Sequence, residues 1–215
     1  MTGTVITIAQ QKGGSGKTTV VANLAVVWAL EQKRSVAVLD VDPQGSLGEW
    51  FERREDRLGE DGTGLTFRTA SGWGAKRESR ALARDHDVVL VDTPPHADLE
   101  SRSAMEQAGL VVVPVQPSPA DLWATEATLM LAEKERIAAL MMLNRVPPRA
   151  RLTGEIVSAL EGFDAPLAKA RLGNRVVFSE SLSMGSTAVE FRRTSPAADE
   201  TRALAAEIWK AAESA

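Results

Sequence analysis

A run of glycine, lysine and threonine near the beginning of the chain has the composition of a phosphate-binding loop. Residues 11–19 read QKGGSGKTT; they follow an apolar run at 5–9 and precede apolar residues at helical spacing at 20–25. Glycines let the backbone curl so that successive N–H groups point at phosphate oxygens, and the positive end of the following helix faces the same anion. Lys17 would reach the terminal phosphates, and the hydroxyl of Thr18 would bind Mg²⁺. The expected nucleotide-binding residues here are Gly13, Gly14, Ser15, Gly16, Lys17, Thr18 and Thr19.

Two further apolar runs end in aspartates that suit the same chemistry. Residues 35–39 lead into Asp40 and Asp42, and residues 88–91 lead into Asp92. Ligand residues of a parallel sheet lie beyond the carboxyl ends of its strands, so we expect Thr18, Asp40 and Asp92 around Mg²⁺, with Asp92 acting through the water shell of the ion. Each aspartate taken alone could simply cap a helix or end a strand. Their combination with the loop favours phosphoryl transfer, which needs positioning and charge neutralisation.

Apolar runs alternate with helical patterns along the rest of the chain. We expect strands at 4–9, 35–40, 65–68, 87–92, 110–115 and 137–143, and helices at 17–31, 46–57, 75–84, 98–107, 120–135, 152–160 and 197–212. Residues 166–193 show no clear pattern. The alternation predicts an α/β fold with a mostly parallel, doubly wound sheet and helices on both faces, in one domain spanning residues 1–215.

Composition excludes several classes of function. The chain has no cysteine, which removes disulfides, thiol catalysis and cysteine-ligated clusters. No apolar run approaches the length of a membrane span, and residues before the first strand are too few for a signal peptide, so we expect a cytoplasmic protein. The net charge is −4, so nucleic-acid binding would need a local basic patch.

The glycine-rich run resembles the deviant Walker A motif, KGGxGKTT, of the ParA/MinD family of ATPases. The standard pattern GxxxxGK[ST] would put glycine at Gln11, whereas here Lys12 stands directly before the glycine pair. Residues 40–45 (DVDPQG) and 92–95 (DTPP) also resemble ParA proteins. Further similar segments cover nearly the whole chain: PSPADLW at 117–123, LNR at 143–145 and RVVFSES at 175–181.

This resemblance implies an ATPase that uses ATP and Mg²⁺ and forms a homodimer with the nucleotides sandwiched between the subunits. It implies that Lys12 reaches the phosphates bound by the other subunit and that Asp42 orients the attacking water, which makes Lys12, Lys17 and Asp42 the expected catalytic residues. Asn144, followed by Arg145, would lie on the adenine. A simple turn residue is the alternative for Asn144.

The resemblance also implies non-specific DNA binding by basic residues in the C-terminal part of the chain. Residues 145–193 contain eight Lys/Arg against five Asp/Glu, inside a chain of negative net charge. The candidates are Arg175, Arg192 and Arg193, which could contact phosphates. A solvated surface explains them equally well, and Arg175 could form a surface ion pair with Glu180.

The expected function is therefore that of a ParA-type ATPase that dimerises on ATP, binds the nucleoid and positions or segregates a plasmid, a chromosome or a protein complex. A stimulating adaptor protein, ParB-like or specific to the cargo, is the expected partner. One alternative is a MinD-like membrane-associated ATPase; Glu207 and Glu213 offset Lys210 in the last helix, which argues against a basic membrane anchor. The other is a metabolic ligase or kinase on the same fold, which Lys12 disfavours.

Overall fold

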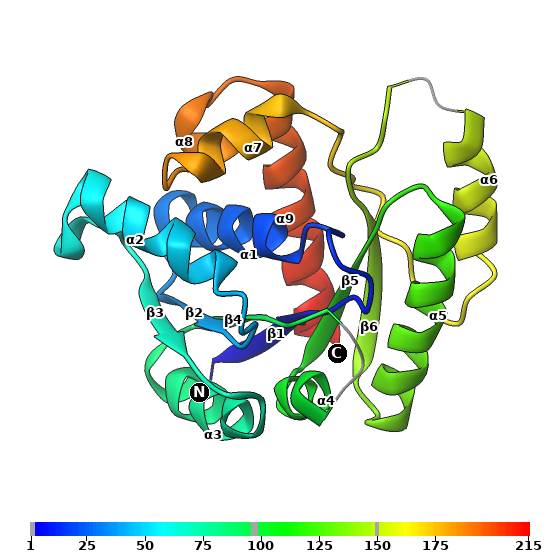
Figure 1. Ribbon diagram of the computed structural model, residues 1–215, viewed down its shortest axis with the longest axis horizontal. Helices are drawn as coiled ribbons and strands as arrows, with labels where there is room; N and C mark the ends of the chain where they lie inside the picture. Colours follow the sequence, from blue (N-terminus) through cyan, green and yellow to red (C-terminus); the bar gives the residue numbers. More distant parts are fainter. Residues whose placement is uncertain (1–2, 96–98, 149–150) are drawn as a thin grey trace.

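The computed structural model describes residues 3–95, 99–148 and 151–215. Its centre is a six-stranded sheet with the strand order β3-β2-β4-β1-β5-β6, in which every neighbouring pair is parallel. This confirms the predicted α/β fold (Figure 1). The strands are β1 (Thr4–Ile8), β2 (Val36–Asp40), β3 (Thr66–Thr69), β4 (Val88–Asp92), β5 (Leu110–Val115) and β6 (Ala138–Leu143).

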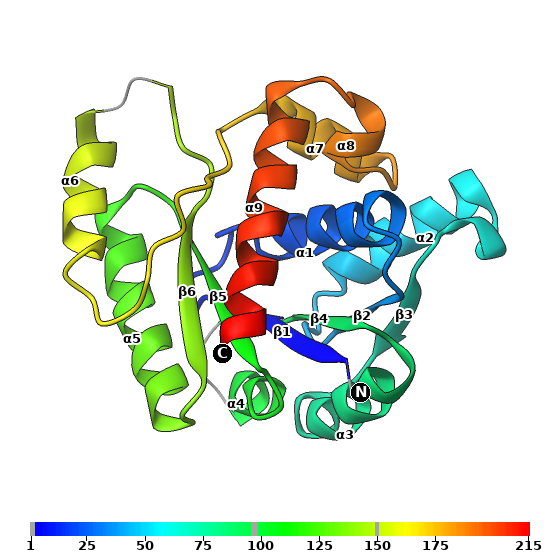
Figure 2. The same cartoon turned by 180° about the vertical axis from the view of Figure 1, so that it is seen from behind.

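Helices cover both faces of the sheet (Figures 1 and 2). One face carries α1 (Lys17–Val26), α2 (Ser46–Leu58), α7 (Val176–Ser183), α8 (Ala188–Phe191) and α9 (Pro196–Ser214). The other face carries α3 (Gly72–Asp85), α4 (Leu99–Met105), α5 (Pro119–Lys134) and α6 (Arg151–Leu160). Within the described residues, no helix is both long and apolar enough to span a bilayer.

Alternation along the strands divides the core into two layers. In β1, Ile6 and Ile8 pack with residues of α1 and α9, whereas Val5 packs on the side of α3. All residues of β2, β4 and β5 are buried. Strands covered on both faces need apolar side chains at every position, which explains why their sequences are continuous apolar runs rather than alternating ones.

The structure places most elements within three residues of their predicted bounds and differs in three places. The first predicted helix continues beyond α1 as a π-helical turn at Val27–Glu31, where the N–H of Gln32 donates to the carbonyl of Val27. Residues 166–193, which showed no pattern, contain α7 and α8, and both helices are too short for a recognisable period. The predicted start of the helix at 98–107 lies outside the described residues, which resume with α4.

A buried arginine joins α2 to α8 on the first face. The guanidinium of Arg54 is fully buried and donates to both carboxylate oxygens of Glu190, at 2.8 and 3.1 Å, and to the carbonyl of Thr63 at 3.0 Å. Such a pair has little net effect compared with apolar packing, but the loss of one partner leaves the other charge unpaired and poorly solvated. Arg57 also pairs with Glu190, at 3.3 Å, but its side chain is 35% exposed, so Arg54 is the buried partner of this carboxylate.

We expect Arg54→Ala to lower the free energy of unfolding by about 3 kcal/mol, because it removes the buried partner of Glu190 and leaves that carboxylate only the 3.3 Å pair with the more exposed Arg57. Arg53→Ala is the matched control. The Arg53 side chain is 51% exposed, and its ion pair among the described residues is a 3.8 Å contact with Glu49, so the variant should lose less than about 1 kcal/mol of unfolding free energy. Urea denaturation of the nucleotide-free chains measures both. Equal losses for the two variants would contradict this reading of the buried pair.

Candidate functional site

The glycine-rich loop lies between the end of β1 and the beginning of α1, with the backbone shape that its sequence predicts. Gly14 and Gly16 have φ values of 75° and 91°, which glycine adopts without strain. A Cβ at Gly16 would also lie 2.4 Å from Nδ2 of Asn144. The backbone N–H groups from Gly13 to Thr19 have no hydrogen-bond partner among the described residues, so they are free to bind an anion.

Lys17 supplies the buried positive charge of the loop. Its ammonium donates to the carbonyl of Gln10 at 3.2 Å, and the residue is only 6% exposed. Burial lowers its pKa, against the opposing effect of the Asp92 and Asp42 carboxylates. Lys17 forms no ion pair with the described residues, so a phosphate in the cradle would strongly stabilise this poorly solvated cation.

Thr18 and Asp92 form the side of the loop that suits a metal ion. The Thr18 hydroxyl donates to Oδ2 of Asp92 at 2.6 Å, whereas the buried Oδ1 has no hydrogen-bond partner among the described residues. Burial raises the pKa of Asp92 to about 7, although the hydrogen bond from Thr18 acts in the opposite direction. An unsatisfied carboxylate oxygen beside a hydroxyl fits a hard cation such as Mg²⁺. The described residues contain no cluster of three His, Cys, Asp or Glu that could hold a metal, so phosphate and water would complete its shell.

Asp40 and Asp42 leave the end of β2 beside this site, because strand pairing places Asp40 next to Asp92. The two carboxylate oxygens of Asp40 accept the N–H groups of Asp42, at 3.0 Å, and Gly48, at 3.1 Å. Asp40 thus fixes the loop and the first turn of α2, and its role as a metal ligand stays a prediction. Asp42 is half-buried and accepts the N–H of Gln44 through Oδ1; its other oxygen makes no hydrogen bond to the described residues.

Lys12 leaves the loop in another direction from Lys17. Its ammonium binds the carboxylate of Asp121 and the hydroxyl of Ser118, the latter at 3.4 Å, in the first turn of α5. Asp121 is fully buried. Gln116, just before the helix, also donates to the carbonyl of Gly14 at 2.6 Å. The beginning of α5 therefore holds the loop at two points.

The sequence did not predict this pairing of Lys12. Residues 118–121 do read as a helix start, with Ser118 as N-cap, Pro119 at the first position and an acidic residue in the first turn. That signature explains Asp121 locally, as a cap residue. No local signal connects it to a lysine more than 100 positions earlier in the chain.

Asn144 reaches the loop from the end of β6. Its Nδ2 donates to the carbonyl of Ser15 at 2.7 Å, and its Oδ1 accepts the N–H of Arg145 at 2.9 Å. Arg145 is exposed and has a positive φ of 50°. The structure thus brings both residues to the phosphate loop, whereas the expected contact of Asn144 with adenine stays a prediction.

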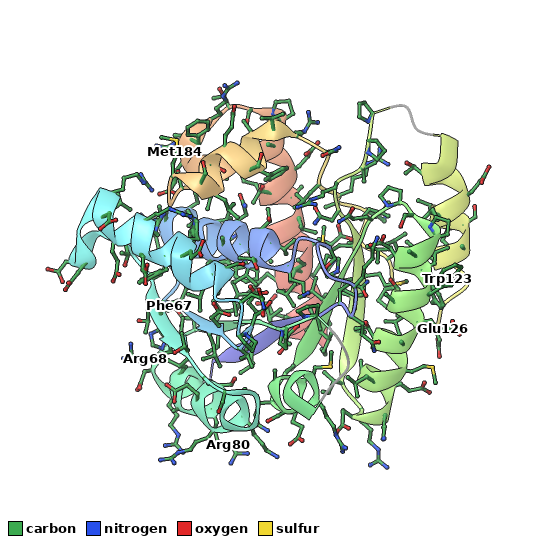
Figure 3. All side chains as sticks on the ribbon, in the orientation of Figure 1. Phe67, Arg68, Arg80, Trp123, Glu126 and Met184 are labelled. Carbon is green, nitrogen blue, oxygen red and sulfur yellow. The ribbon has the colours of Figure 1, made fainter. Side chains whose placement is uncertain are left out.

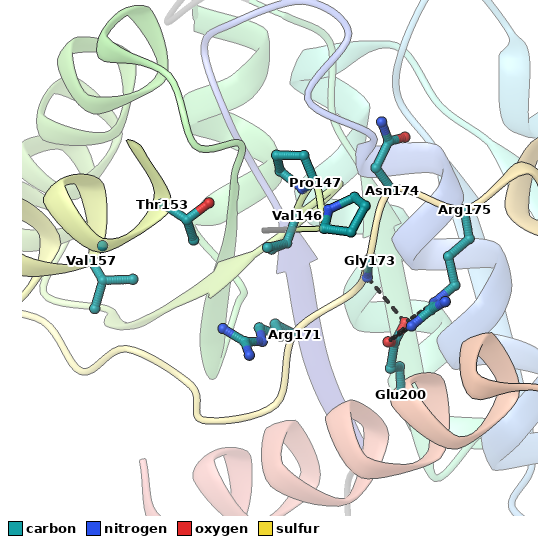
Figure 4. Close-up of a pocket in the computed structure, with 11 residues that line it drawn as sticks. Val146, Pro147, Thr153, Val157, Arg171, Gly173, Asn174, Arg175 and Glu200 are labelled. Atoms are coloured by element: carbon teal, nitrogen blue, oxygen red, sulfur yellow. Dashed lines mark hydrogen bonds and ion pairs between the residues drawn. The ribbon is translucent and has the colours of Figure 1, made fainter. Parts of the chain in front are cut away.

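A cavity of about 540 Å³ opens directly after Arg145 (Figure 4). It lies between the segment that follows β6, helix α6, residues 171–175 and α9. A pocket of this size accommodates a small ligand, and its place next to the phosphate loop suits the nucleoside end of a nucleotide. Its labelled residues are Val146, Pro147, Thr153, Val157, Arg171, Gly173, Asn174, Arg175 and Glu200.

The three arginines expected at a DNA surface have different surroundings. Arg175 borders the cavity and pairs with Glu200 at 2.6 Å, so the suggested pair with Glu180 is wrong. The hydrogen bond to Glu200 raises the pKa of Arg175. Arg192 and Arg193 are exposed, and neither forms an ion pair within the described part of the chain. Of these three arginines, Arg192 and Arg193 keep a charge that no described carboxylate neutralises and that a polyanion could bind.

We expect Asp92→Asn to stabilise the nucleotide-free protein at high pH. The folded chain retains a proton on Asp92 up to about pH 7, whereas an unfolded aspartate loses it near 3.8, so stability falls as the pH rises through this window. The increase in the free energy of unfolding caused by Asp92→Asn should grow from near zero at about pH 4 to on the order of 4 kcal/mol above pH 7. Thermal melts over this range measure it.

Asp87→Asn is the control of opposite sign. Hydrogen bonds from the backbone and hydroxyl of Ser35 lower the pKa of Asp87, so its ionised form stabilises the fold above the ordinary carboxyl range. That variant should melt at a lower temperature at neutral pH. If the two variants follow the same trend with pH, the buried charge at Asp92 is not the cause.

Comparisons with known proteins agree with the geometry of the site. Residues 6–171 match the family described as the CobQ/CobB/MinD/ParA nucleotide binding domain. The chain is 34% identical to the chromosome-partitioning ATPase Soj of Thermus thermophilus, covering 94% of both chains. It is 28% identical to maintenance of carboxysome distribution protein A of Halothiobacillus neapolitanus, covering 94% of this chain and 95% of the relative.

A solved structure gives the same result for the fold. The septum site-determining protein MinD from Pyrococcus horikoshii, complexed with Mg-ADP, superposes with a TM-score of 0.83 at 26% identity, covering 97% of each chain. The free N–H groups of the loop, the buried Lys17 and the open oxygen of Asp92 provide the groups that such a ligand needs. The chain belongs to the CobQ/CobB/MinD/ParA family of nucleotide-binding proteins and is an ATPase that uses ATP with Mg²⁺.

Proposed function

We propose that this ATPase positions or segregates a cargo by an ATP-dependent cycle of dimerisation and DNA binding. Relatives named for carboxysome distribution and for chromosome partitioning support this class of function. In this proposal the whole chain is one domain that works in the cytoplasm on the nucleoid. A cargo-specific or ParB-like adaptor protein stimulates an otherwise weak hydrolysis.

The direction of Lys12 is the observation that carries the proposal. One lysine, Lys17, already serves the cradle of its own loop. The ammonium of Lys12 instead lies on α5, bound to Asp121 and Ser118. Because its own loop does not use this charge, Lys12 is available for a nucleotide held by a second subunit. There it would neutralise charge that develops on the transferred phosphoryl group.

The remaining residues divide the chemistry among them. When ATP and Mg²⁺ are bound, the metal supplies charge neutralisation at the phosphates. Lys17 and the loop N–H groups hold the phosphates, and Thr18 and Asp92 hold the metal. Asp42, whose free oxygen faces no described donor, orients the attacking water. The cavity after Arg145 receives the nucleoside.

The contact between Lys12 and Asp121 would also determine which nucleotide state favours the dimer. Asp121 is buried with Lys12 as its cationic partner, so moving Lys12 into a second subunit leaves a buried carboxylate less well compensated. The phosphates of the facing nucleotide must offset that cost. ATP would therefore favour the dimer, and the loss of its terminal phosphate would favour the separated subunits with Lys12 back on α5.

The alternative of a membrane-associated ATPase receives no support from the last helix. Leu204, Ala205 and Ile208 of α9 are buried against the protein's own core. Glu207 accepts the N–H groups of Lys169 and Ala170, at 2.8 Å each. A helix whose apolar face is already covered has no such face left for a bilayer.

We expect Lys12→Ala to retain most of its ATP affinity but to lose both ATP-dependent dimerisation and hydrolysis. Asp42→Ala should bind ATP, dimerise and hydrolyse it slowly. A mixture of the two variants should recover activity, because one site of the heterodimer has both an intact Asp42 and a lysine from its neighbour. Light scattering and phosphate release measure these outcomes.

The control is a mixture of two single variants, Lys17→Ala and Asp42→Ala. Lys17 acts within its own loop, so its neighbour cannot supply it. One site of this heterodimer lacks Lys17 and the other lacks Asp42, and neither should recover activity. If heterodimers of Lys12→Ala and Asp42→Ala form but remain as inactive as their parents, Lys12 does not act across the interface.

The DNA surface is tested by Arg192→Glu combined with Arg193→Glu. Both side chains are exposed and form no ion pair with a described residue. The double variant should therefore weaken DNA binding by at least about tenfold and reduce its salt dependence, at unchanged ATP affinity. Arg77→Glu with Arg84→Glu, two exposed arginines of α3, changes the net charge equally and should have a much smaller effect. Equal losses in both pairs would mean that total charge, rather than this surface, determines binding.

A further inference from the structure

A second cavity lies at the opposite edge of the sheet from the phosphate loop. It measures about 680 Å³, and its walls include Leu110 and Ala138, the first residues of β5 and β6. The nucleotide site, in contrast, lies beyond the carboxyl ends of the strands. We call this cavity the α5 groove. Its lining comes from the second half of α5, the beginning of β6, residues 163–166 and the end of α9.

The wall of the α5 groove is mainly apolar. Leu129, Ile137 and Phe163 are partly buried there, and Met130 is 64% exposed. The structure exposes few other large apolar side chains to this extent, and Trp123, at 71%, lies two turns earlier on α5. Methionine adapts its shape to an apolar partner, and a hollow lined in this way is a recognised form of binding surface.

Acidic side chains surround this apolar wall. Glu126, Glu133 and Asp164 line the cavity, all three are exposed, and no lysine or arginine is among the lining residues. None of the three forms an ion pair within residues 3–95, 99–148 and 151–215. Glu126 and Glu133 stand four residues before and three after Met130, which places all three on one face of the helix. Figure 3 shows Glu126 and Trp123 along the outer side of α5.

We propose that the α5 groove binds a cationic amphipathic segment of a partner protein. Apolar side chains of the segment would fill the cavity and cover Met130, while its lysines or arginines would pair with Glu126, Glu133 and Asp164. Charge complementarity selects this occupant: the carboxylates repel an anionic lipid surface and nucleic acid, and they attract a basic peptide. The proposal goes beyond the ATPase cycle and does not depend on it.

The groove also has a physical connection to the nucleotide site through α5. The helix has 16 residues and so extends about 24 Å. Its first turn carries Asp121, which binds Lys12, and its second half carries Met130 and Glu133. A partner in the groove would therefore touch the same helix that holds Lys12.

The test uses the full nucleotide-free chain and three fluorescent peptides of 16 residues. The first probe is an amphipathic helix with leucines on one face and lysines beside them; the second replaces the lysines by glutamates, and the third replaces the leucines by serines. Anisotropy should show saturable 1:1 binding of the first probe alone. We expect Met130→Lys, and Glu126→Lys combined with Glu133→Lys, each to weaken binding by at least about tenfold.

Matched variants elsewhere on the surface serve as controls. Met184→Lys changes another exposed methionine, 53% exposed, which Figure 3 shows at the upper left, away from Trp123 and Glu126 on α5. Glu52→Lys with Glu60→Lys makes the same change of charge on exposed residues outside the groove. Both should leave the affinity within about twofold of the unmodified chain. Met130→Gln, an uncharged change, should weaken binding by an intermediate factor.

Several results would overturn the proposal. They are binding that the groove variants do not change, equal binding of the glutamate probe, and equal losses in the control variants. Self-association that Met130→Lys abolishes would instead assign the groove to a second copy of this chain. Binding of the unmodified chain to anionic phospholipid vesicles through Met130 would assign it to a membrane.

Discussion

Parallel pairing of β1, β2 and β4 is the constraint on which the rest of the site depends. The register aligns Asp92 with Ile8 on one side and with Asp40 on the other, so the loops that leave these strands emerge together. Thr18 can then reach Asp92 from the first turn of α1, and Asp40 can hold the loop that carries Asp42. Continuous apolar strands make this alignment rigid, because a shift in register would displace packed residues on both faces of the sheet.

Charges in this site are arranged for a ligand and reduce the stability of the chain without one. Burial lowers the pKa of Lys17 and raises that of Asp92, which shows that each charged form is poorly solvated. Within the part of the chain that the structure describes, one oxygen of Asp92 has no hydrogen-bond partner, and neither do the loop N–H groups from Gly13 to Thr19. Phosphate and Mg²⁺ bound together would satisfy these groups. Elsewhere the structure compensates its buried charge internally, as Arg54 and Glu190 do.

Helix α5 connects three parts of the molecule that the sequence keeps apart. Its first turn binds Lys12, and Gln116, three residues before the helix, donates to the phosphate loop. Its second half forms a wall of the α5 groove. The helix thus borders the nucleotide site at one end and a surface suited to a basic partner at the other. This arrangement places partner recognition and nucleotide binding on one rigid element of the sheet's second face.

Local sequence determined the strands, the long helices and the phosphate loop, because continuous apolar runs, helical spacing and glycine at positive φ are each properties of neighbouring residues. It also predicted which loops carry Asp40, Asp42, Asp92 and Asn144, since parallel strands release their polar residues at one edge. The tertiary structure alone decided the partners of the side chains: Lys12 binds Asp121, Asn144 binds Ser15, and Arg175 pairs with Glu200 rather than Glu180. It alone formed α7, α8 and the α5 groove. These features depend on contacts between residues distant in the chain, and such contacts leave no periodicity or spacing in the sequence from which they could be read.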